Sequence, residues 1–170
     1  MFCEWPVIER WVVHCVAPLV NRRLSNHRRD EIEAAYNRLD AIRKEGFKLA
    51  CTVSGAAHLI TLLYKDKLER SLIGETKGFP FRKSFAREAL KTLHGDIQLL
   101  APTPQHFKHA EELWYAYCER GEKAAYAQFA DYVDAAMVLD NDAISDVIVH
   151  HQHIPYILNK ARSNIQIRHI

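Results

Sequence analysis

Residues 129–154, FADYVDAAMVLDNDAISDVIVHHQHI, decide the predicted fold. The first half continues a helix predicted over Glu122 to Asp140, whose inner face carries apolar residues at helical spacing: Phe129, Val133, Ala136 and Met137. The second half contains a short apolar run, Asp146 to His150, with the length and composition of a buried strand. A helix that leads into a buried strand is the repeating unit of a parallel sheet covered by helices.

The same alternation extends over the rest of the chain. The other predicted strands are Trp11 to Val16, Phe47 to Val53, Ile97 to Ala101 and Ile165 to Ile170. The other predicted helices run from Ser25 to Lys44, from a cap at Ser54, from Phe81 to His94, from Thr103-Pro104 to Gly121 and from Pro155 to Arg162. This order predicts one α/β domain over residues 1–170, a three-layer α/β/α sandwich with a mainly parallel sheet of about five strands. Ligands of such sheets bind at the carboxyl ends of the strands.

Composition excludes several classes of protein. The 48% hydrophobic and 26% charged fractions are those of an ordinary globular domain rather than a disordered chain. A formal net charge of +2 gives no overall attraction to nucleic acid or membrane. No apolar run reaches the roughly 18 residues that span a bilayer, and the four cysteines form no CxxC pair. We therefore expect a cytoplasmic protein with reduced cysteines and no membrane partner.

Two segments near the carboxyl end of the chain, Asp131 to Ala136 and Ile144 to Ile154, resemble a known protein family. These segments resemble the carboxyl-terminal pattern of PIN domains, in which an aspartate near a helix start is followed by a strand and a second acidic residue. Leu49 to Leu63 and Val12 to Leu19 are similar to the family's second and first strands, so the resemblance covers nearly the whole chain. It implies a nuclease fold, found in many toxins of toxin–antitoxin pairs, whose acidic residues hold Mg²⁺ or Mn²⁺ and cleave RNA.

Histidines occupy most of the positions that the resemblance assigns to acidic residues. The matched positions, in chain order, are His14, His58, Asp134 and His151 or, with a shift of one residue, His150. Because Mg²⁺ prefers oxygen ligands, this set predicts the loss of standard Mg²⁺-dependent ribonuclease activity. Imidazoles with one carboxylate instead suit a transition metal such as Zn, Mn, Fe or Ni, and the alternative is a decayed site of unrelated histidines. Asp134 and Asp131, one turn apart, are the candidate catalytic carboxylates.

Basic residues supply a candidate contact for RNA. Arg22, Arg23, Arg28 and Arg29 follow the first predicted strand, close to the expected site, and could hold a phosphate backbone. Ordinary solvated charge is the alternative interpretation. The aromatic stripe around Trp114 suits a helix–helix or homodimer contact. Two functional classes remain open: a PIN-like protein that binds RNA or a protein partner without Mg²⁺ catalysis, and a metal-dependent RNA hydrolase with a histidine-rich site.

Overall fold

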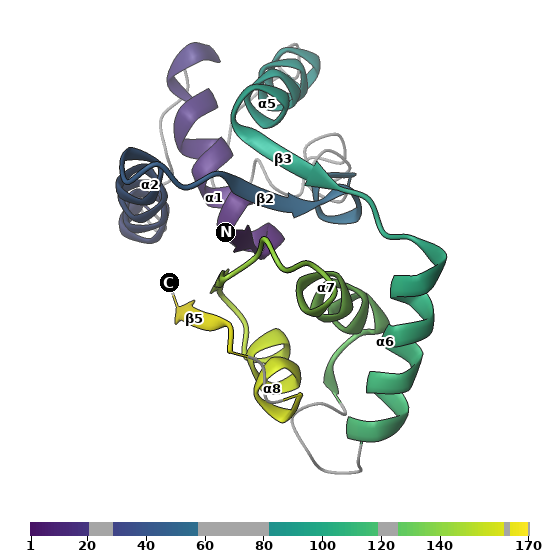
Figure 1. Ribbon diagram of the computed structural model, residues 1–170. Helices are drawn as coiled ribbons and strands as arrows, with labels where there is room; N and C mark the ends of the chain where they lie inside the picture. Colours follow the sequence, from purple (N-terminus) through teal and green to yellow (C-terminus); the bar gives the residue numbers. More distant parts are fainter. Residues whose placement is uncertain (21–28, 58–81, 119–125, 162–163, 170) are drawn as a thin grey trace.

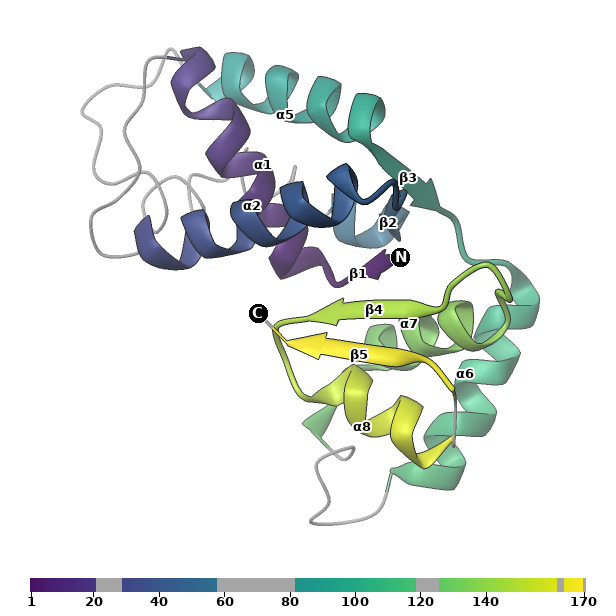
Figure 2. The same cartoon turned by 60° about the vertical axis from the view of Figure 1, so that its left-hand side comes forward.

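Five parallel strands form one sheet in this computed structural model, which describes residues 1–20, 29–57, 82–118, 126–161 and 164–169 (Figure 1). The strand order is β3-β2-β1-β4-β5. The strands are β1 (Phe2–Cys3), β2 (Leu49–Thr52), β3 (Ile97–Leu100), β4 (Asp146–Val149) and β5 (Gln166–His169). Helices cover both faces of the sheet, which confirms the expected three-layer α/β/α sandwich (Figure 2).

Each face of the sheet has its own group of helices and its own apolar core. One group is α1 (Trp5–Val16), α2 (Arg29–Lys44) and α5 (Arg82–Asp96), with the short 3-10 helix η1 (Pro18–Val20) beside them. The other group is α6 (Pro104–Tyr117), α7 (Phe129–Leu139) and α8 (His153–Lys160). The buried side chains accordingly divide into two clusters, one on each face of the sheet. None of the described helices combines the length and the apolar character needed to cross a membrane.

The first strand was predicted at the wrong place. Trp11 to Val16 is the second half of α1, and β1 is the two-residue segment Phe2–Cys3. The helix begins after Glu4 with Pro6 in its first turn, and most of its side chains are buried. A helix buried around most of its circumference has a continuous apolar run that cannot be told from a buried strand by composition alone.

Most other predicted elements are confirmed, with small differences at their ends. Strands β2 to β5 lie inside their predicted ranges, and α6 begins at Pro104 with Thr103 as its cap. Helix α8 begins at His153, two residues before the predicted start, and residues 53–57 are helical as expected after β2. The predicted ends that lie outside the described residues are Ser25, Phe81, Gly121, Glu122, Arg162 and Ile170.

The order of the strands determines where a ligand can bind. The chain winds from β1 to β2 and β3 in one direction, and then continues with β4 and β5 on the other side of β1. Phe2 in β1 pairs with both Ala50 of β2 and Val147 of β4. The winding therefore reverses between β1 and β4, and the carboxyl ends of these two strands are the usual position of a ligand in sheets of this kind.

Candidate functional site

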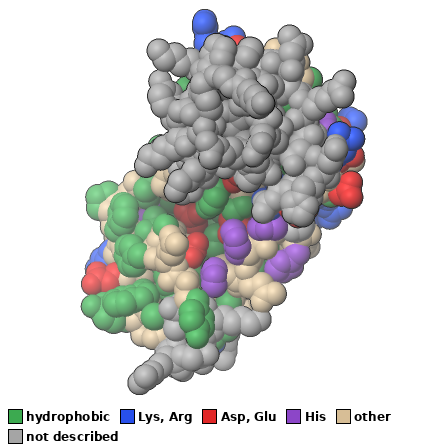
Figure 3. Space-filling model, turned by 180° about the vertical axis from the view of Figure 1, so that it is seen from behind, with side chains coloured by type: hydrophobic (Ala, Val, Ile, Leu, Met, Phe, Trp, Pro, Cys, Tyr) green, Lys and Arg blue, Asp and Glu red, His purple; other side chains and the backbone are tan. Residues whose placement is uncertain are grey.

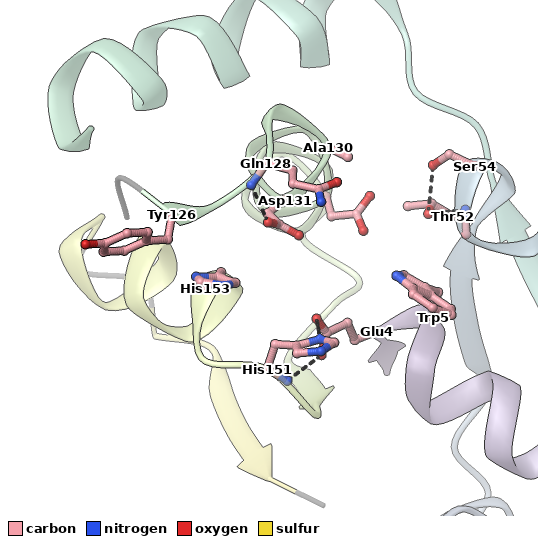
Figure 4. Close-up of a pocket in the computed structure, with 12 residues that line it drawn as sticks. Glu4, Trp5, Thr52, Ser54, Tyr126, Gln128, Ala130, Asp131, His151 and His153 are labelled. Atoms are coloured by element: carbon pink, nitrogen blue, oxygen red, sulfur yellow. Dashed lines mark hydrogen bonds and ion pairs between the residues drawn. The ribbon is translucent and has the colours of Figure 1, made fainter. Parts of the chain in front are cut away.

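A pocket of about 500 Å³ opens at the reversal point (Figure 4). It is bounded by the carboxyl ends of β1, β2 and β4 and by the first turns of α7 and α8. The ionisable and hydroxyl side chains that line it are Glu4, Thr52, Ser54, Asp131, Asp134, His151 and His153, with Trp5 and Tyr126 as aromatic lining. Figure 3 shows histidine side chains gathered on the back of the molecule beside acidic ones. Segments distant in sequence thus bring carboxylates and imidazoles to one cavity.

Glu4 is the acidic residue at the end of the first strand, the position that the sequence analysis assigned to His14. Its side chain is 4% exposed and reaches from β1 to the turn after β4. Glu4 Oε2 accepts hydrogen bonds from the backbone N–H of His150 at 2.6 Å and of His151 at 2.9 Å. Glu4 Oε1 lies 2.9 Å from His151 Nδ1. The carboxylate therefore ties together the two strands between which the winding reverses.

The contact with Glu4 determines the protonation pattern of the His151 ring. An ionised carboxylate only accepts hydrogen bonds, so His151 Nδ1 carries the proton and donates it to Glu4 Oε1. In the neutral ring, Nε2 then keeps its lone pair. The His151 side chain is 49% exposed and lines the pocket, and none of the described residues hydrogen bonds to Nε2.

His150 is held on the other side of the turn, away from the pocket lining. Arg10 Nη2 lies 3.2 Å from His150 Nε2 and 3.3 Å from Glu31 Oε2, while Arg10 Nη1 donates to the carbonyl oxygen of Pro6. Because arginine has no acceptor atom, His150 Nε2 accepts this hydrogen bond. His150 contributes its backbone N–H to the Glu4 carboxylate, and its ring ties the turn to α1 and α2.

Two aspartates project from the first turns of α7. Asp131 is in a capping box, where its Oδ2 accepts the backbone N–H of Gln128 at 2.8 Å. Asp134 follows one turn later and is 8% exposed. Burial raises the pKa of Asp134 to about 7, and the negative charges of Asp131 and Glu4 act in the same direction. Burial also raises the pKa of Asp131, although its backbone hydrogen bond to Gln128 opposes the shift.

Thr52, the last residue of β2, provides the hydrogen bond that favours ionised Asp134. Thr52 Oγ1 accepts the backbone N–H of Gly55 and the hydroxyl of Ser54, each at 3.1 Å. With these two donors in place, the hydroxyl proton of Thr52 remains available to Asp134. Gly55 is required because a Cβ there would lie 2.7 Å from the Cβ of Trp5, so α1 and the 53–57 helix approach closely at the pocket wall.

His153 adds a second imidazole to the pocket from the first turn of α8. Its Nδ1 is buried and has no hydrogen-bond partner among the described residues. In Figure 4 the ring lies between Tyr126 and His151, below Asp131. The carboxylates of α7 therefore face imidazoles from the β4–α8 turn across the cavity.

Several predicted site residues lie elsewhere or outside the described residues. His14 is on α1, where its ring stacks on Tyr36 of α2 with centroids 3.9 Å apart, so the prediction that it ends the first strand in the site is wrong. Burial lowers the pKa of His14. The predicted residues outside the described segments are His58, Arg22, Arg23 and Arg28. Arg29 begins α2, is exposed and does not line the pocket.

The structure thus brings together Asp131, Asp134 and His151 of the predicted set, with His153, which the sequence also offers as a neighbouring ligand, and adds Glu4. Among the residues that the structure describes, no three histidine, cysteine, aspartate or glutamate side chains form a ready metal-binding group. The sequence did contain a signal for a helix start directly after Glu4, since a proline such as Pro6 is typical of the first turn of a helix. The first strand was instead predicted at the apolar run Trp11 to Val16, which follows Glu4 in the sequence.

Comparison of the chain with protein-family models, with curated proteins and with solved structures finds no match.

Proposed function

We propose that this protein hydrolyses phosphodiester bonds with the help of a divalent cation held by Asp131 and Asp134. The observation that carries the proposal is the pair of carboxylates in one pocket, with Asp131 half-buried and Asp134 buried, where burial and neighbouring negative charge raise the pKa of Asp134 to about 7. Keeping such a carboxylate ionised beside other negative charges is costly, and a bound cation would remove that cost. RNA is the substrate class that the PIN resemblance implies.

The donor atoms suit a hard cation. Mg²⁺ is commonly held by one or two carboxylates together with water and substrate phosphates, so two aspartates are sufficient. The expected loss of Mg²⁺ activity rested on histidines at most of the cation-binding positions. His14 lies on α1 outside the pocket, His58 lies outside the described residues, and the two aspartates of α7 supply oxygen ligands. We therefore propose Mg²⁺ or Mn²⁺ in place of the histidine-held transition metal.

Each residue of the pocket has its own role in cation binding and hydrolysis. When bound, a divalent cation neutralises charge on the phosphate and polarises the oxygens attached to it. Thr52 orients the Asp134 carboxylate through its hydroxyl proton, and the Gln128 backbone N–H orients Asp131. Trp5 and Tyr126 line the cavity on opposite sides of the carboxylates (Figure 4).

Cleavage of a labelled RNA oligonucleotide in Mg²⁺, Mn²⁺ or Zn²⁺ tests the proposal. We expect cleavage in Mg²⁺ or Mn²⁺ that Asp134→Asn lowers by at least about a hundredfold, because one cation ligand loses its charge. Asp142→Asn, on an exposed residue of the α7–β4 connection, is the matched control and should cleave as the wild type does. Absence of cleavage in every cation, or equal activity in Asp134→Asn, would contradict the proposal. Cation binding without cleavage would favour the binding class instead.

A further inference from the structure

We propose that His151 is the proton acceptor of this hydrolysis and that Glu4 positions its ring instead of holding the cation. The inference rests on the proposed function and assigns roles to two residues of the same pocket. Its basis is the arrangement of Glu4, the turn after β4 and the exposed face of the imidazole (Figure 4).

Glu4 already accepts three hydrogen bonds from donors of the protein. Two backbone N–H groups bind its Oε2 and one ring N–H binds its Oε1, while its side chain is only 4% exposed. An ion at Glu4 would have to compete with these short hydrogen bonds for the carboxylate oxygens. Asp131 and Asp134 differ, since the hydrogen bond to the Gln128 backbone uses only one oxygen of Asp131, and Thr52 gives Asp134 a single hydroxyl proton. Asp131 and Asp134 therefore have oxygens left for a cation, whereas Glu4 is bound to the His151 ring.

His151 has the features of a proton acceptor. Its Nδ1–H is fixed on Glu4, so the neutral ring presents the Nε2 lone pair on the side away from Glu4. The side chain is half exposed and lines the same cavity as Asp131 and Asp134. A carboxylate that holds one ring nitrogen also stabilises the imidazolium formed when the other nitrogen takes up a proton. Among the described residues no donor occupies Nε2, so a water molecule can bind there.

The proposed step is balanced without any other reactant. As the oxygen of a water molecule bonds to phosphorus, one of its protons passes to His151 Nε2 and the bond from phosphorus to the leaving oxygen breaks. The leaving oxygen takes a proton from solvent. His151 then releases its extra proton to solvent and returns to the neutral form, with Nδ1–H still on Glu4.

Glu4→Gln tests the positioning role because its effect on the ring can be foreseen atom by atom. Two backbone N–H groups bind Oε2, so the amide oxygen of glutamine must occupy that place. Its NH₂ group then faces His151 Nδ1 and requires that nitrogen to accept. The ring should change tautomer, placing the proton on Nε2 and removing the acceptor from the pocket. We expect the ¹⁵N signals of the His151 ring to report this exchange and cleavage to fall by about a hundredfold or more.

His151→Gln provides a second test at a half-exposed position. We expect a similar loss of cleavage with unchanged Mn²⁺ affinity, measured by calorimetry, while His94→Gln on the exposed face of α5 leaves both unchanged. Weaker Mn²⁺ binding in His151→Gln would mean that His151 holds the cation and would overturn the inference. Full activity in His151→Gln, or in a Glu4→Gln protein whose tautomer has changed, would also overturn it.

The two proposals can fail separately. If the wild type cleaves RNA and Asp134→Asn does not, while His151→Gln retains activity, only the inference about His151 is lost. If the wild type cleaves nothing in any cation, the proposed function fails and the catalytic role of His151 fails with it. The ¹⁵N tautomer measurement would then still report whether Glu4 orients the ring.

Discussion

Glu4 and Asp134 are both buried carboxylates of the pocket. They differ in the number of hydrogen-bond donors around them and therefore suit different roles. Glu4 is surrounded by hydrogen-bond donors from the turn after β4, which replace the water that it loses. Asp134 has one hydroxyl donor and faces the negative charges of Asp131 and Glu4. The first arrangement holds a strand end in place, and the second leaves a deficit of positive charge that a cation can supply.

The pH dependence of stability should reveal Asp134 in metal-free protein. Its pKa rises from 3.8 to about 7 on folding, so the folded state binds the proton more tightly than the unfolded chain. The free energy of unfolding should therefore fall as pH increases from about 4 to about 7, by up to about 4 kcal/mol. Asp134→Asn should be more stable than the wild type at pH 8 and nearly equal at pH 4, as measured by urea unfolding with chelator present.

Asp142→Asn serves as the control for that measurement, because Asp142 is exposed. Asp146 has a lowered pKa, through hydrogen bonds from Ser145 and Arg168, and contributes the opposite dependence. Only the difference between Asp134→Asn and the wild type isolates Asp134. A difference that does not change between pH 4 and pH 8 would show that the carboxyl group is not perturbed.

At the scale of elements, α1 explains why the first strand was misplaced. Its residues from Trp5 to Val16 are mostly buried between the sheet, α2 and α5, so the polar stripe that marks a surface helix is short. The strand before it has only two residues, fewer than the alternating pattern needs to become visible. By contrast, α6 has a capping residue, a proline in its first turn and an exposed polar face, and its start was predicted correctly.

The junction between α1 and the 53–57 helix gives a prediction about the pocket wall. Gly55→Ala places a methyl group 2.7 Å from the Cβ of Trp5 and 3.2 Å from Thr52 Oγ1. The two helices must separate, and we expect a loss of about 1–3 kcal/mol in the free energy of unfolding, as for other overpacked sites. Gly95→Ala, where nothing lies within 4 Å of the added methyl group, is the control and should be close to neutral. Thermal and denaturant unfolding measure both, and equal stability of the two variants would contradict the close approach.

At the scale of the whole molecule, the sheet joins two cores that meet along β1 and β4. The clusters on its two faces draw on different helices, and Phe2 and Cys3 pair directly with Val147 and Ile148 across the centre. Glu4 continues this connection beyond the last residue of β1, through the backbone N–H groups of His150 and His151. The hydrogen bonds of Glu4 at the pocket therefore also connect the carboxyl ends of β1 and β4.

Glu4→Ala should weaken that edge. Removing the carboxylate leaves two backbone N–H groups and the His151 ring without their acceptor, and we expect a loss of about 2–4 kcal/mol in the free energy of unfolding. Hydrogen exchange of the His150 and His151 amides should become faster than in the wild type. Glu33→Ala, an exposed residue of α2, is the matched control. Unchanged exchange at the two amides would argue against the hydrogen bonds to Glu4.

The sequence by itself determined the fold class, four of the five strands and most of the helices, because buried strands and capped amphipathic helices leave local patterns that composition and spacing reveal. The family resemblance further named Asp131, Asp134 and His151 as candidates, and these three residues line one pocket in the structure. Only the tertiary structure decided that Glu4 rather than His14 belongs to the site and that His150 turns towards Arg10. The physical reason is that a strand of two residues is too short to show the alternation of apolar and polar residues that marks a strand in a sequence. Its place at the centre of the sheet is specified by hydrogen bonds and packing with residues more than 40 positions away.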